Sequence, residues 1–597
     1  MFTAYLSKLP SFLQDYRLAP DSQDRRFWER DDDELREFIL RDAAVLSKEP
    51  LPSLLASDYL AFTKTGSRIL YENPYFARRR RLGTLALAYC LKPDEQVMQA
   101  IIDCIWAICE ESTWCLPAHN SYIRDTPQLP LAQVDRPVID LFSAETAATL
   151  AQVYALLKHA LDEETPLIAQ RIEKEIEQRI HKPYLEEHFW WMGKDGEPMN
   201  NWTVWCTQNV LLSTFLLPTC QIFRHRVAGK ALASLDFFLK DYGDDGCCSE
   251  GAQYYRHAGL CLYLCIDILN QVGSNFLKPV YQEPKIRNIA SFIRHIHAQG
   301  PYYFNFSDCS ALAGPSTIRE LLFARAIDDA ELEAFALHSA QLRPKSERHL
   351  SQEINLTYRL LELMNQHSME TEAFLPPQCD HSYPSVGIFT SYDKHFALAV
   401  KAGGNDDSHN HNDTGSITLY KDGKPVLIDI GVETYTKQTF STQRYAIWTM
   451  RSVYHNLSNF PPHEQQAGRT FCSTVLENTE GPERIISMEL AGSYPRGIGL
   501  HSYRRTVTHR KGRDIIIKEQ VEGTCVPILS LMTVEQPLVE NKLIHVGKDA
   551  LIRFSEDLCS VEVETIPITD ARLLAVWPKQ VYRILASYDH HLEITIT

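Results

Sequence analysis

The sequence predicts a multidomain α+β protein, with a long helical N-terminal part followed by an antiparallel β-sheet part. Its 597 residues exceed the usual size of a single hydrophobic core. Between about residues 30 and 370, apolar residues recur at three- and four-residue spacing, the period of an amphipathic helix. After a proline-containing stretch at 375–384, short β-rich runs take over. We therefore expect domains at residues 1–375 and 376–597.

The helical pattern has ordinary helix lengths and contains no heptad repeat. The connections between periodic segments are rich in Pro, Gly, Asn and Asp, which end helices and form turns. This combination indicates a stacked or toroidal array of helices rather than a coiled coil. The clearest helical segments are residues 82–109, 144–161, 227–239, 252–272 and 356–364.

The β-rich runs of the C-terminal part alternate in hydrophobicity and are separated by turn residues. Asp422-Gly423 lies between two such runs, which is a strong signal for a hairpin. We expect an antiparallel β-sandwich. Its strands should come from residues 386–391, 395–403, 415–431, 502–521 and 591–597.

Composition excludes several classes of protein. A net charge of −16 argues against a general nucleic-acid binder, which presents a basic face. The longest apolar stretches, such as residues 260–269, reach only about half the ~20 residues that cross a bilayer, so we expect no membrane association. No secretory signal pattern opens the chain, and 15 cysteines lie scattered in apolar contexts. We expect a cytoplasmic protein, or a periplasmic or secreted one if a leader has been removed.

Residues 244–259 (DDGCCSEGAQYYRHAG) place a polar stripe on an apolar helix. If Ser249 or Glu250 begins this helix, Glu250, Tyr254 and His257 follow one another along one face. Two interpretations stay open. The stripe is either a buried hydrogen-bond network or part of a functional site.

Two further segments combine aromatic rings with amides. In residues 199–209 (MNNWTVWCTQN), Asn200 or Asn201 can cap a helix, and Trp202 and Trp205 can stack on sugar rings or fill the core. A loop at residues 110–120 (EESTWCLPAHN) adds an aromatic ring, an imidazole and an amide suited to a polar ligand. Its candidates are Trp114, His119 and Asn120.

Residues 409–431 (HNHNDTGSITLYKDGKPVLIDIG) suggest a metal or catalytic site. His409 and His411 are two apart, so on an extended segment they point the same way. Asp429 ends the hairpin and His455 follows downstream, which completes a His/Asp/His set of zinc-ligand types. The alternative is that both histidines hydrogen-bond within a sheet edge. The polar residues around them favour a functional site.

Several of these motifs occur together, in order, in one known family. The helical half contains NNW and DG-x3-EG-x2-Y, and the β half contains H-x-H-x-D, a strand ending in D-x-G and a later HN. This pattern resembles the heparinase II/III-like polysaccharide lyases across about residues 110–460. The resemblance implies an N-terminal incomplete (α/α) toroid followed by a C-terminal antiparallel β-sandwich. It also implies a carbon–oxygen lyase that cleaves uronic-acid-containing polysaccharides by β-elimination.

The resemblance also implies residue roles. Tyr254 matches the catalytic tyrosine, Asn201 the position that neutralises the substrate carboxylate, and His409 the catalytic histidine. Some members have histidine in place of Asn201, and the adjacent Tyr255 leaves the choice of tyrosine open. His411, Asp429 and His455 match residues that hold a structural zinc in several members. Substrate contacts are expected from Trp114, His119, Asn120, Trp202, Glu250, Arg256 and His257.

The expected partner is therefore an acidic polysaccharide or oligosaccharide of glycosaminoglycan type, and the oligomeric state, a homo-oligomer included, stays open. Three alternatives compete with the lyase. One is a glycoside hydrolase on an (α/α) toroid, with Asp245 and Glu250 as its carboxylate pair. The others are a metal-dependent enzyme of cupin type and a carbohydrate-binding protein without catalysis.

Overall fold

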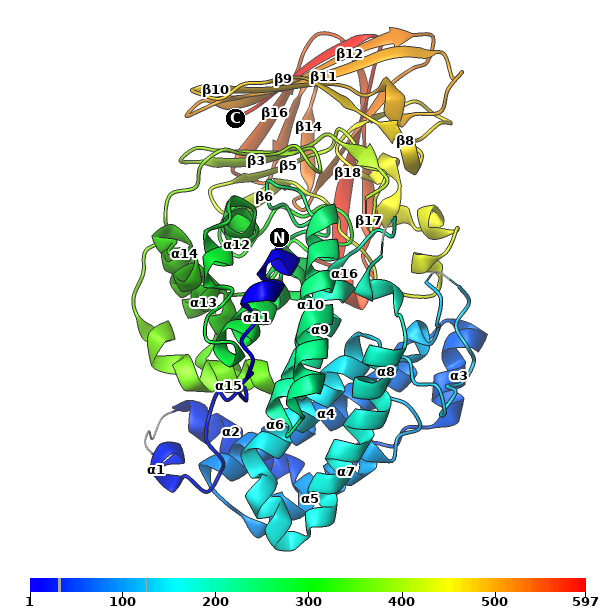
Figure 1. The fold of residues 1–597 in the computed structure, drawn as a ribbon. Coiled ribbons are helices and arrows are strands. Elements are labelled where there is room, and N and C mark those ends of the chain that lie inside the picture. Colours follow the sequence, from blue (N-terminus) through cyan, green and yellow to red (C-terminus); the bar gives the residue numbers. More distant parts are fainter. Residues whose placement is uncertain (30–33, 125, 195, 408) are drawn as a thin grey trace. The chain divides into compact units, whose positions relative to one another are not determined.

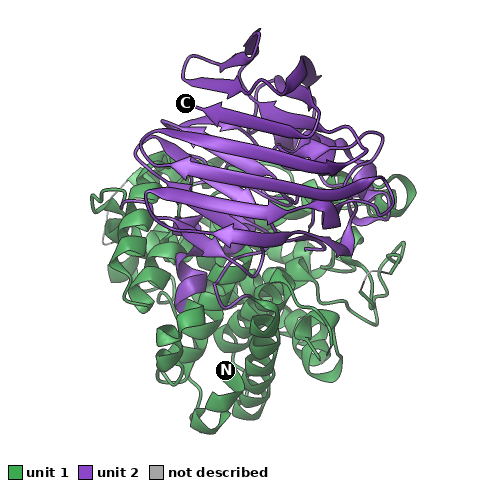
Figure 2. Cartoon of the chain, turned by 90° about the horizontal axis from the view of Figure 1, so that it is seen from above, with its two compact units in different colours: residues 1–242, 257–286, 315–375 green, residues 243–256, 287–314, 376–597 purple. Residues whose placement is uncertain are grey.

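The computed structural model describes residues 1–29, 34–124, 126–194, 196–407 and 409–597. The chain forms two compact units (Figure 2). Unit 1 comprises residues 1–242, 257–286 and 315–375, and unit 2 comprises residues 243–256, 287–314 and 376–597. Two segments from the helical region of the sequence therefore belong to the unit that contains the strands. One of them carries Glu250 and Tyr254, so these residues share a unit with His409.

Unit 1 is built from helices, as the 3.6-residue period indicates (Figure 1). Within it, α6 packs against α4, α7 and α9, and α9 also packs against α10. The division between the units falls inside α11 and α12. The helices up to α15 are α1 (Arg25–Trp28), α2 (Glu34–Leu46), α3 (Ala56–Thr65), α4 (Ile69–Leu91), α5 (Glu95–Cys109), α6 (Leu141–Glu164), α7 (Pro166–Ile176), α8 (Lys182–Glu186), α9 (Asn201–Leu216), α10 (Gln221–Asp241), α11 (Ala252–Val272), α12 (Pro284–His295), α13 (Ile318–Ala326), α14 (Ala330–Gln341) and α15 (Leu356–Asn365).

The expected helix at 82–109 is two helices, α4 and α5. The break lies at residues 92–94, where Pro93 disfavours a helical conformation at Lys92. The Asp94 side chain then caps α5 by accepting a hydrogen bond from the Val97 amide at 3.0 Å. Apolar residues at helical spacing on both sides of this break led to the expectation of one helix. None of the helices in the described ranges is long and apolar enough to cross a membrane.

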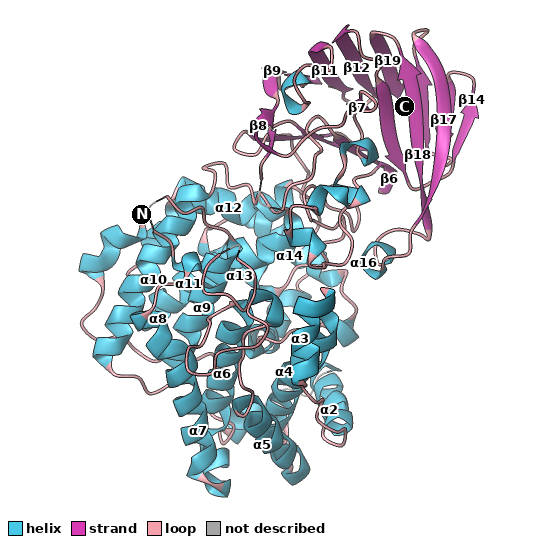
Figure 3. Cartoon of the chain, turned by 90° about the vertical axis from the view of Figure 1, so that its right-hand side faces the viewer, coloured by secondary structure: helices cyan, strands magenta, loops and turns pink. Residues whose placement is uncertain are grey.

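Unit 2 contains every strand of the described chain (Figure 3). The strands are β1 (His381–Tyr383), β2 (Ile388–Tyr392), β3 (Phe396–Lys401), β4 (Gly404–Asn405), β5 (Ile417–Lys421), β6 (Lys424–Leu427), β7 (Ser458–Asn459), β8 (Gly468–Cys472), β9 (Thr474–Asn478), β10 (Glu483–Glu489), β11 (Leu500–Arg510), β12 (Asp514–Gly523), β13 (Ile528–Thr533), β14 (Pro537–Glu540), β15 (Leu543–Val546), β16 (Ala550–Phe554), β17 (Leu558–Pro567), β18 (Gln580–Tyr588) and β19 (His591–Ile596). A short helix, α16 (Ala571–Leu574), joins β17 to β18.

These strands form an antiparallel sandwich. One sheet has the order β1-β2-β3-β5-β6, a second β14-β15-β16-β19-β12-β11-β10-β9 and a third β17-β18-β13-β7, and β4 pairs with β8. One cluster of buried side chains draws on all three larger sheets, for example Leu419 of β5, Ile517 of β12 and Ile584 of β18. The sheets therefore share one core. The predicted fold class, helical N-terminal part and antiparallel β-sandwich, is confirmed.

The hairpin predicted at Asp422-Gly423 connects β5 and β6. Both turn residues have positive φ, 48° at Asp422 and 81° at Gly423, as a type I′ turn requires. The strand that follows runs into Asp429, so the turn fixes where this carboxylate lies along the chain.

A buried ion pair connects the sandwich to the loops that precede β5 and β7. Arg505 and Glu519 are paired across β11 and β12, are at most 1% exposed, and form a hydrogen bond of 2.9 Å from Nε to Oε1. The Arg505 Nη1 also donates to the carbonyl oxygens of Asn456, at 2.6 Å, and Gly415. A buried guanidinium is costly unless its N–H groups have acceptors, so the Arg505 side chain keeps its hydrogen bonds to both carbonyl oxygens. Arg505 therefore fixes both loops to the sheet.

Candidate active site and metal centre

A buried carboxylate, Asp308, is the centre of the candidate site in unit 2. It is 0% exposed and lies in the loop after α12. Its Oδ2 contacts His409 Nδ1 at 2.8 Å and Tyr435 OH at 3.2 Å. Its Oδ1 contacts His411 Nε2 at 3.0 Å and Arg444 Nη2 at 2.6 Å. One carboxylate thus joins two histidines, a phenol and a guanidinium.

The charge state of Asp308 determines the proton positions around it. Burial raises its pKa, but hydrogen bonds from His409 and His411 outweigh this and hold the pKa well below the ordinary range. An ionised carboxylate only accepts hydrogen bonds. His409 therefore donates from Nδ1 and His411 from Nε2, and the opposite nitrogen of each ring is left for other chemistry.

The segment that carries the two histidines is a loop, and the sequence-based expectation of an extended segment is wrong here. His409 has φ of 57°, in the left-handed region, so His409 and His411 approach Asp308 with different ring nitrogens. His409 Nε2 lies 3.8 Å from Glu250 Oε2. Burial lowers the pKa of His409, but the hydrogen bond to Asp308 and the charge of Glu250 together raise it by more. The net shift of the His409 pKa is therefore upward.

Tyr254 lies in the first turn of α11 and faces His409. Their ring centroids are 5.4 Å apart in a stacked arrangement. The Tyr254 hydroxyl is 2.5 Å from the Tyr435 hydroxyl. Because Tyr435 donates its hydrogen to Asp308, its oxygen is the acceptor for Tyr254. A chain of hydrogen bonds therefore links the phenol of Tyr254 to the carboxylate that orients His409.

Burial raises the pKa of Tyr254 to about 12, against the opposing effects of the Arg572 charge and the Tyr435 hydrogen bond. Arg572, in α16, lies with its guanidinium carbon 4.6 Å from the centre of the Tyr435 ring. It also donates to the Asp308 carbonyl oxygen at 2.9 Å. At neutral pH the Tyr254 phenol is therefore protonated, and Arg572 is the nearby cation that can stabilise a phenolate.

The start of α11 depends on a glycine. The helix begins at Ala252, so Glu250 precedes it rather than lying on its face as expected. Gly251 has φ of 84°, and a Cβ there would lie 2.6 Å from the Cβ of Cys309. This close approach brings Glu250 and the first turn of α11 beside the loop of Asp308.

The adjacent tyrosine has a different environment. Tyr255 is 0% exposed, and its hydroxyl donates to the carbonyl oxygen of Ala290 at 2.9 Å. Tyr254, by contrast, is half-buried and directed toward His409. The geometry favours Tyr254 as the tyrosine of the candidate site.

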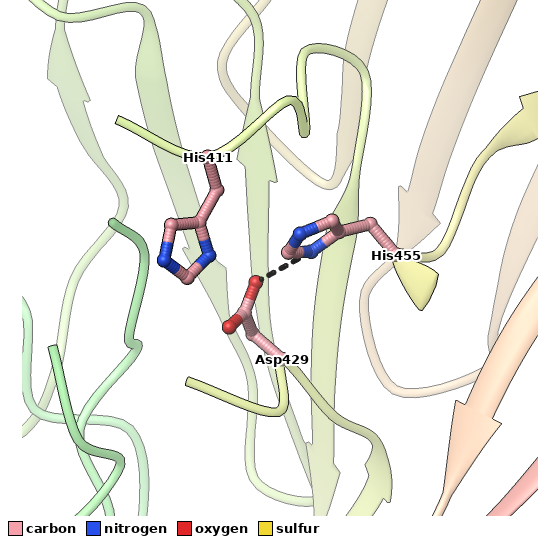
Figure 4. Close-up of side chains that lie close together, drawn as sticks. All are labelled: His411, Asp429 and His455. Carbon is pink, nitrogen blue, oxygen red and sulfur yellow. Dashed lines mark hydrogen bonds and ion pairs between the residues drawn. The ribbon is translucent and has the colours of Figure 1, made fainter. Parts of the chain in front are cut away.

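His411, Asp429 and His455 form a buried cluster that could hold a metal ion (Figure 4). Their candidate ligand atoms all lie within 4.8 Å of one another. His411 Nδ1 and His455 Nε2 are buried without a hydrogen-bond partner, and His455 Nδ1 lies 3.0 Å from Asp429 Oδ2. A buried polar atom without a partner costs about 1–3 kcal/mol, so coordination would remove an unfavourable term. Two imidazoles and a carboxylate are also ligands that suit zinc.

The surroundings of this cluster are those of a metal site. The His411 Nε2–H donates a hydrogen bond to Asp308 Oδ1, the arrangement that orients metal-binding histidines in other proteins. Asp429 Oδ1 accepts hydrogen bonds from the Gly431 amide at 2.8 Å and from Asn305 Nδ2 at 3.3 Å. The residues present therefore fit a bound metal ion, and Asp308 connects them to His409.

Three of the remaining candidates gather in unit 1. Asn201 is the first residue of α9 and is 7% exposed, after an N-cap formed by Asn200, which accepts from the Trp202 amide at 3.0 Å. The rings of His119 and Trp202 are 4.7 Å apart, and His119 Nδ1 lies 2.8 Å from Asp140 Oδ2. Asn201, Trp202 and His119 thus form a polar and aromatic group at one end of α9.

The other substrate-contact candidates have structural partners. Trp114 is 1% exposed and donates to the Ile108 carbonyl oxygen at 2.8 Å, and Asn120, also 1% exposed, donates to Leu129 O at 3.2 Å. His257 stacks on Trp205 with ring centroids 3.9 Å apart, and Arg256 donates to Gly314 O at 2.9 Å. Their contact with a substrate stays a prediction.

Four residues of the site were absent from the sequence prediction: Asp308, Tyr435, Arg444 and Arg572. Asp308 is a single acid in an apolar run, YYFNFSDCSAL, and an acid in such a run needs a buried partner. This pattern predicts that Asp308 has a buried partner, but it does not identify the partner. Arg572 and Tyr435 have no fixed spacing to the histidines, so only the fold brings them together.

If His409 is catalytic, as proposed below, replacing Asp308 with asparagine should lower kcat by about 10²–10⁴-fold, because His409 loses the charged acceptor that orients it. Metal affinity should fall about 10–100-fold, since His411 loses its hydrogen-bonded carboxylate. Steady-state kinetics and metal analysis of the purified protein measure both. Asp393→Asn is the matched control, because Asp393 accepts from His509 Nε2 at 3.0 Å in the same unit. Turnover and metal content both within twofold of wild type would refute this role for Asp308.

The fold and the site together define the architecture: an N-terminal helical unit and a C-terminal β-sandwich unit that presents tyrosine and histidine side chains. Several solved structures share it. The crystal structure of heparinase III aligns with a TM-score of 0.66 and 12% identity, over 100% of this chain and 88% of that chain. A mutant heparan sulfate lyase from Pedobacter heparinus aligns with a TM-score of 0.58 and 12% identity, over 100% and 86%. At these identities the likeness is one of fold.

A more distant match is the chondroitin AC lyase of Streptomyces coelicolor in complex with chondroitin sulphate, with a TM-score of 0.50 and 11% identity over 99% of this chain and 82% of that chain. No curated protein matches the sequence. Residues 375–524 match the family described as "Heparinase II/III-like, C-terminal". This part of the chain is similar to that domain, and the resemblance found in the sequence is confirmed.

Proposed function

We propose that this protein is a polysaccharide lyase that cleaves uronic-acid-containing, glycosaminoglycan-like poly- or oligosaccharides by β-elimination. The observation that carries the proposal is the stacked pair of Tyr254 and His409, joined through Tyr435 and Asp308. A phenol and an imidazole are the acid and base that such a reaction needs. The shared fold with heparinase III and the family match of the C-terminal part support it.

The first chemical requirement is to neutralise the uronate carboxylate. Removing the hydrogen at C5 builds negative charge on a group that is already charged, so a hydrogen-bond donor must stabilise the intermediate. We assign this role to Asn201, with His119 and Trp202 as neighbours that contact the sugar. One such donor is worth about 3 kcal/mol.

The second requirement is proton transfer at C5 and at the C4 oxygen. The protonated phenol of Tyr254 suits the acid that protonates the C4 oxygen as its bond to carbon breaks. In an anti elimination His409 takes the C5 proton. In a syn elimination Tyr254 serves as base and acid in turn, and Arg572 stabilises its phenolate. This pair could therefore process both uronate epimers.

We propose zinc as the ion of the His411, Asp429 and His455 cluster, with a structural rather than hydrolytic role. When bound it supplies a fixed crosslink between the loops of these three residues. Asp308 accepts a hydrogen bond from His411 with one carboxylate oxygen and from His409 with the other. A metal ion that fixes the position of His411 would therefore also fix the orientation of Asp308 and His409.

The test is a panel of heparan sulfate, chondroitin sulfate, hyaluronan and alginate, with product formation followed by the ultraviolet absorbance of the 4,5-unsaturated uronate. We expect cleavage of at least one with this chromophore. Reducing ends released without it would instead indicate the hydrolase. In the hydrolase alternative Asp245 would be catalytic, but its Oδ1 accepts from the Ser385 hydroxyl at 2.7 Å and its Oδ2 from the Ser385 amide at 2.8 Å, which is a structural role.

A further inference from the structure

Unit 2 contains a pocket of about 510 Å³ beside the loop that carries the two site histidines. Its lining includes Asn412, Tyr445 and Arg451, together with residues 462–467. We propose that this pocket is a distal subsite that binds an uncharged sugar unit of the polysaccharide. The inference rests on the proposed function for the identity of the polymer, but not for the existence of the pocket.

The lining has the mixed character that a sugar ring requires. Pro462, Ala467 and Pro495 offer apolar surface for the C–H face of a pyranose. Arg451 and Glu464 offer planar donors and acceptors for its hydroxyl groups. The volume lies in the range of about 300–1,000 Å³ that small-molecule sites occupy.

Asn412 provides an acceptor without a partner. The residue is 5% exposed, and its Nδ2 donates to the Gln465 carbonyl oxygen at 3.1 Å. Its Oδ1 is buried and has no hydrogen-bond partner. Rotation of the Asn412 side chain toward the pocket would let a ligand hydroxyl or amide N–H satisfy this oxygen and remove a penalty of about 1–3 kcal/mol. Tyr445 accepts from Asn410 Nδ2 at 3.1 Å, so its own hydrogen is available to a ligand oxygen.

The wall of the pocket is held rigidly. Gln465 Oε1 accepts from Asn405 Nδ2 at 3.0 Å and from the Thr414 amide at 3.1 Å, and its Nε2 donates to the Thr414 carbonyl oxygen at 2.6 Å. This amide is used entirely for structure. It fixes the chain on both sides of the pocket, so a ligand meets a preformed surface.

The charge of the pocket indicates which unit of the polymer it binds. Arg451 forms a bidentate ion pair with Glu464, so its charge is already balanced within the pocket. A sulfate or carboxylate would have to compete with Glu464 for the same guanidinium. An uncharged sugar carrying hydroxyl or acetamido groups meets no such competition.

The position of the pocket connects it to the reaction. Asn412 is three residues from His409, and three residues of extended chain span at most about 11 Å. A sugar bound at Asn412 would therefore lie within a few ring lengths of the candidate base. One polysaccharide chain long enough could occupy both places.

The experiment compares unsulfated heparosan tetrasaccharide and octasaccharide as substrates. Arg451→Met should lower the octasaccharide-to-tetrasaccharide ratio of kcat/KM about tenfold, because only the longer chain reaches the pocket. Ala467→Trp, which fills the pocket without removing a polar group, should do the same. The matched control is Arg510→Met, which removes a similar partly exposed arginine–carboxylate pair, with Asp514, elsewhere in unit 2. It should leave the ratio unchanged. Exposed pairs contribute about 0–1 kcal/mol, so both arginine variants should fold.

Calorimetric titration with the octasaccharide separates this proposal from the proposed function. Weaker binding by Arg451→Met and Ala467→Trp, without any unsaturated product from wild type, would support the subsite and refute cleavage of heparosan. Product formation with an unchanged length ratio and unchanged octasaccharide binding in both variants would refute the subsite and leave the lyase standing.

Discussion

Replacing Tyr254 with phenylalanine should lower kcat about 10³-fold, within the 10²–10⁴ range of a lost general acid or base. The phenol is a neutral acid at pH 7, is half-buried, and stacks on His409 with ring centroids 5.4 Å apart, closer than the 6.2 Å of Tyr435. Phenylalanine keeps the ring and its contact with His409. The Tyr435 hydroxyl keeps its hydrogen bond to Asp308, so the Tm should change little. Initial rates and thermal melts measure the two effects.

Tyr255→Phe is the control for this experiment. It removes a phenol from the next position of the same helix, but one that donates to the Ala290 carbonyl oxygen. We expect near wild-type turnover and a loss of about 1 kcal/mol in stability. If Tyr254→Phe keeps more than a tenth of wild-type kcat while Tyr255→Phe does not, the tyrosine has been misassigned. If both keep it, neither phenol is the acid.

The helices, strands and hairpin could be predicted from sequence because they depend on local patterns. The period of apolar residues gave α11 at its observed bounds, and Asp422-Gly423 gave the β5–β6 turn. His411, Asp429 and His455 were suggested by residue type and by the family resemblance, and the structure brings their ligand atoms within 4.8 Å of one another. For the helix and the turn, the information lies within a few residues of the feature.

The rest of the site depends on contacts between distant segments. Asp308 meets His409 across 101 positions, and Tyr254 meets Tyr435 across 181. No local pattern predicts such pairs. The same reason explains why the segment with Tyr254 lies in the unit of the strands, although its own sequence is helical. Sequence therefore suggested the acid and the base, whereas the residue that orients the base came from the fold.

Replacing His411 with alanine should abolish tight metal binding and lower the Tm by about 8–16 °C. A metal ion at about 1,000 times its Kd stabilises the folded state by about 4 kcal/mol. For a unit of this size, each kcal/mol shifts the Tm by about 2–4 °C. His411 is 0% exposed and has one ring nitrogen bound to Asp308 and the other without a hydrogen-bond partner, so no residue of the described chain replaces it. Elemental analysis gives the metal content, and calorimetry the Tm.

A chelator distinguishes metal loss from the simple loss of a buried side chain. Chelation should lower the Tm of wild type toward that of His411→Ala and leave the variant unchanged. His509→Ala is the control, because His509 is equally buried in unit 2 but both its ring nitrogens have partners, Ser391 Oγ at 2.9 Å and Asp393 Oδ2 at 3.0 Å. It should destabilise through the cavity it leaves, keep its metal, and still respond to the chelator. A His411→Ala protein that retains both its metal and its Tm would show that the ligands and the catalytic histidine have been divided wrongly between His409 and His411.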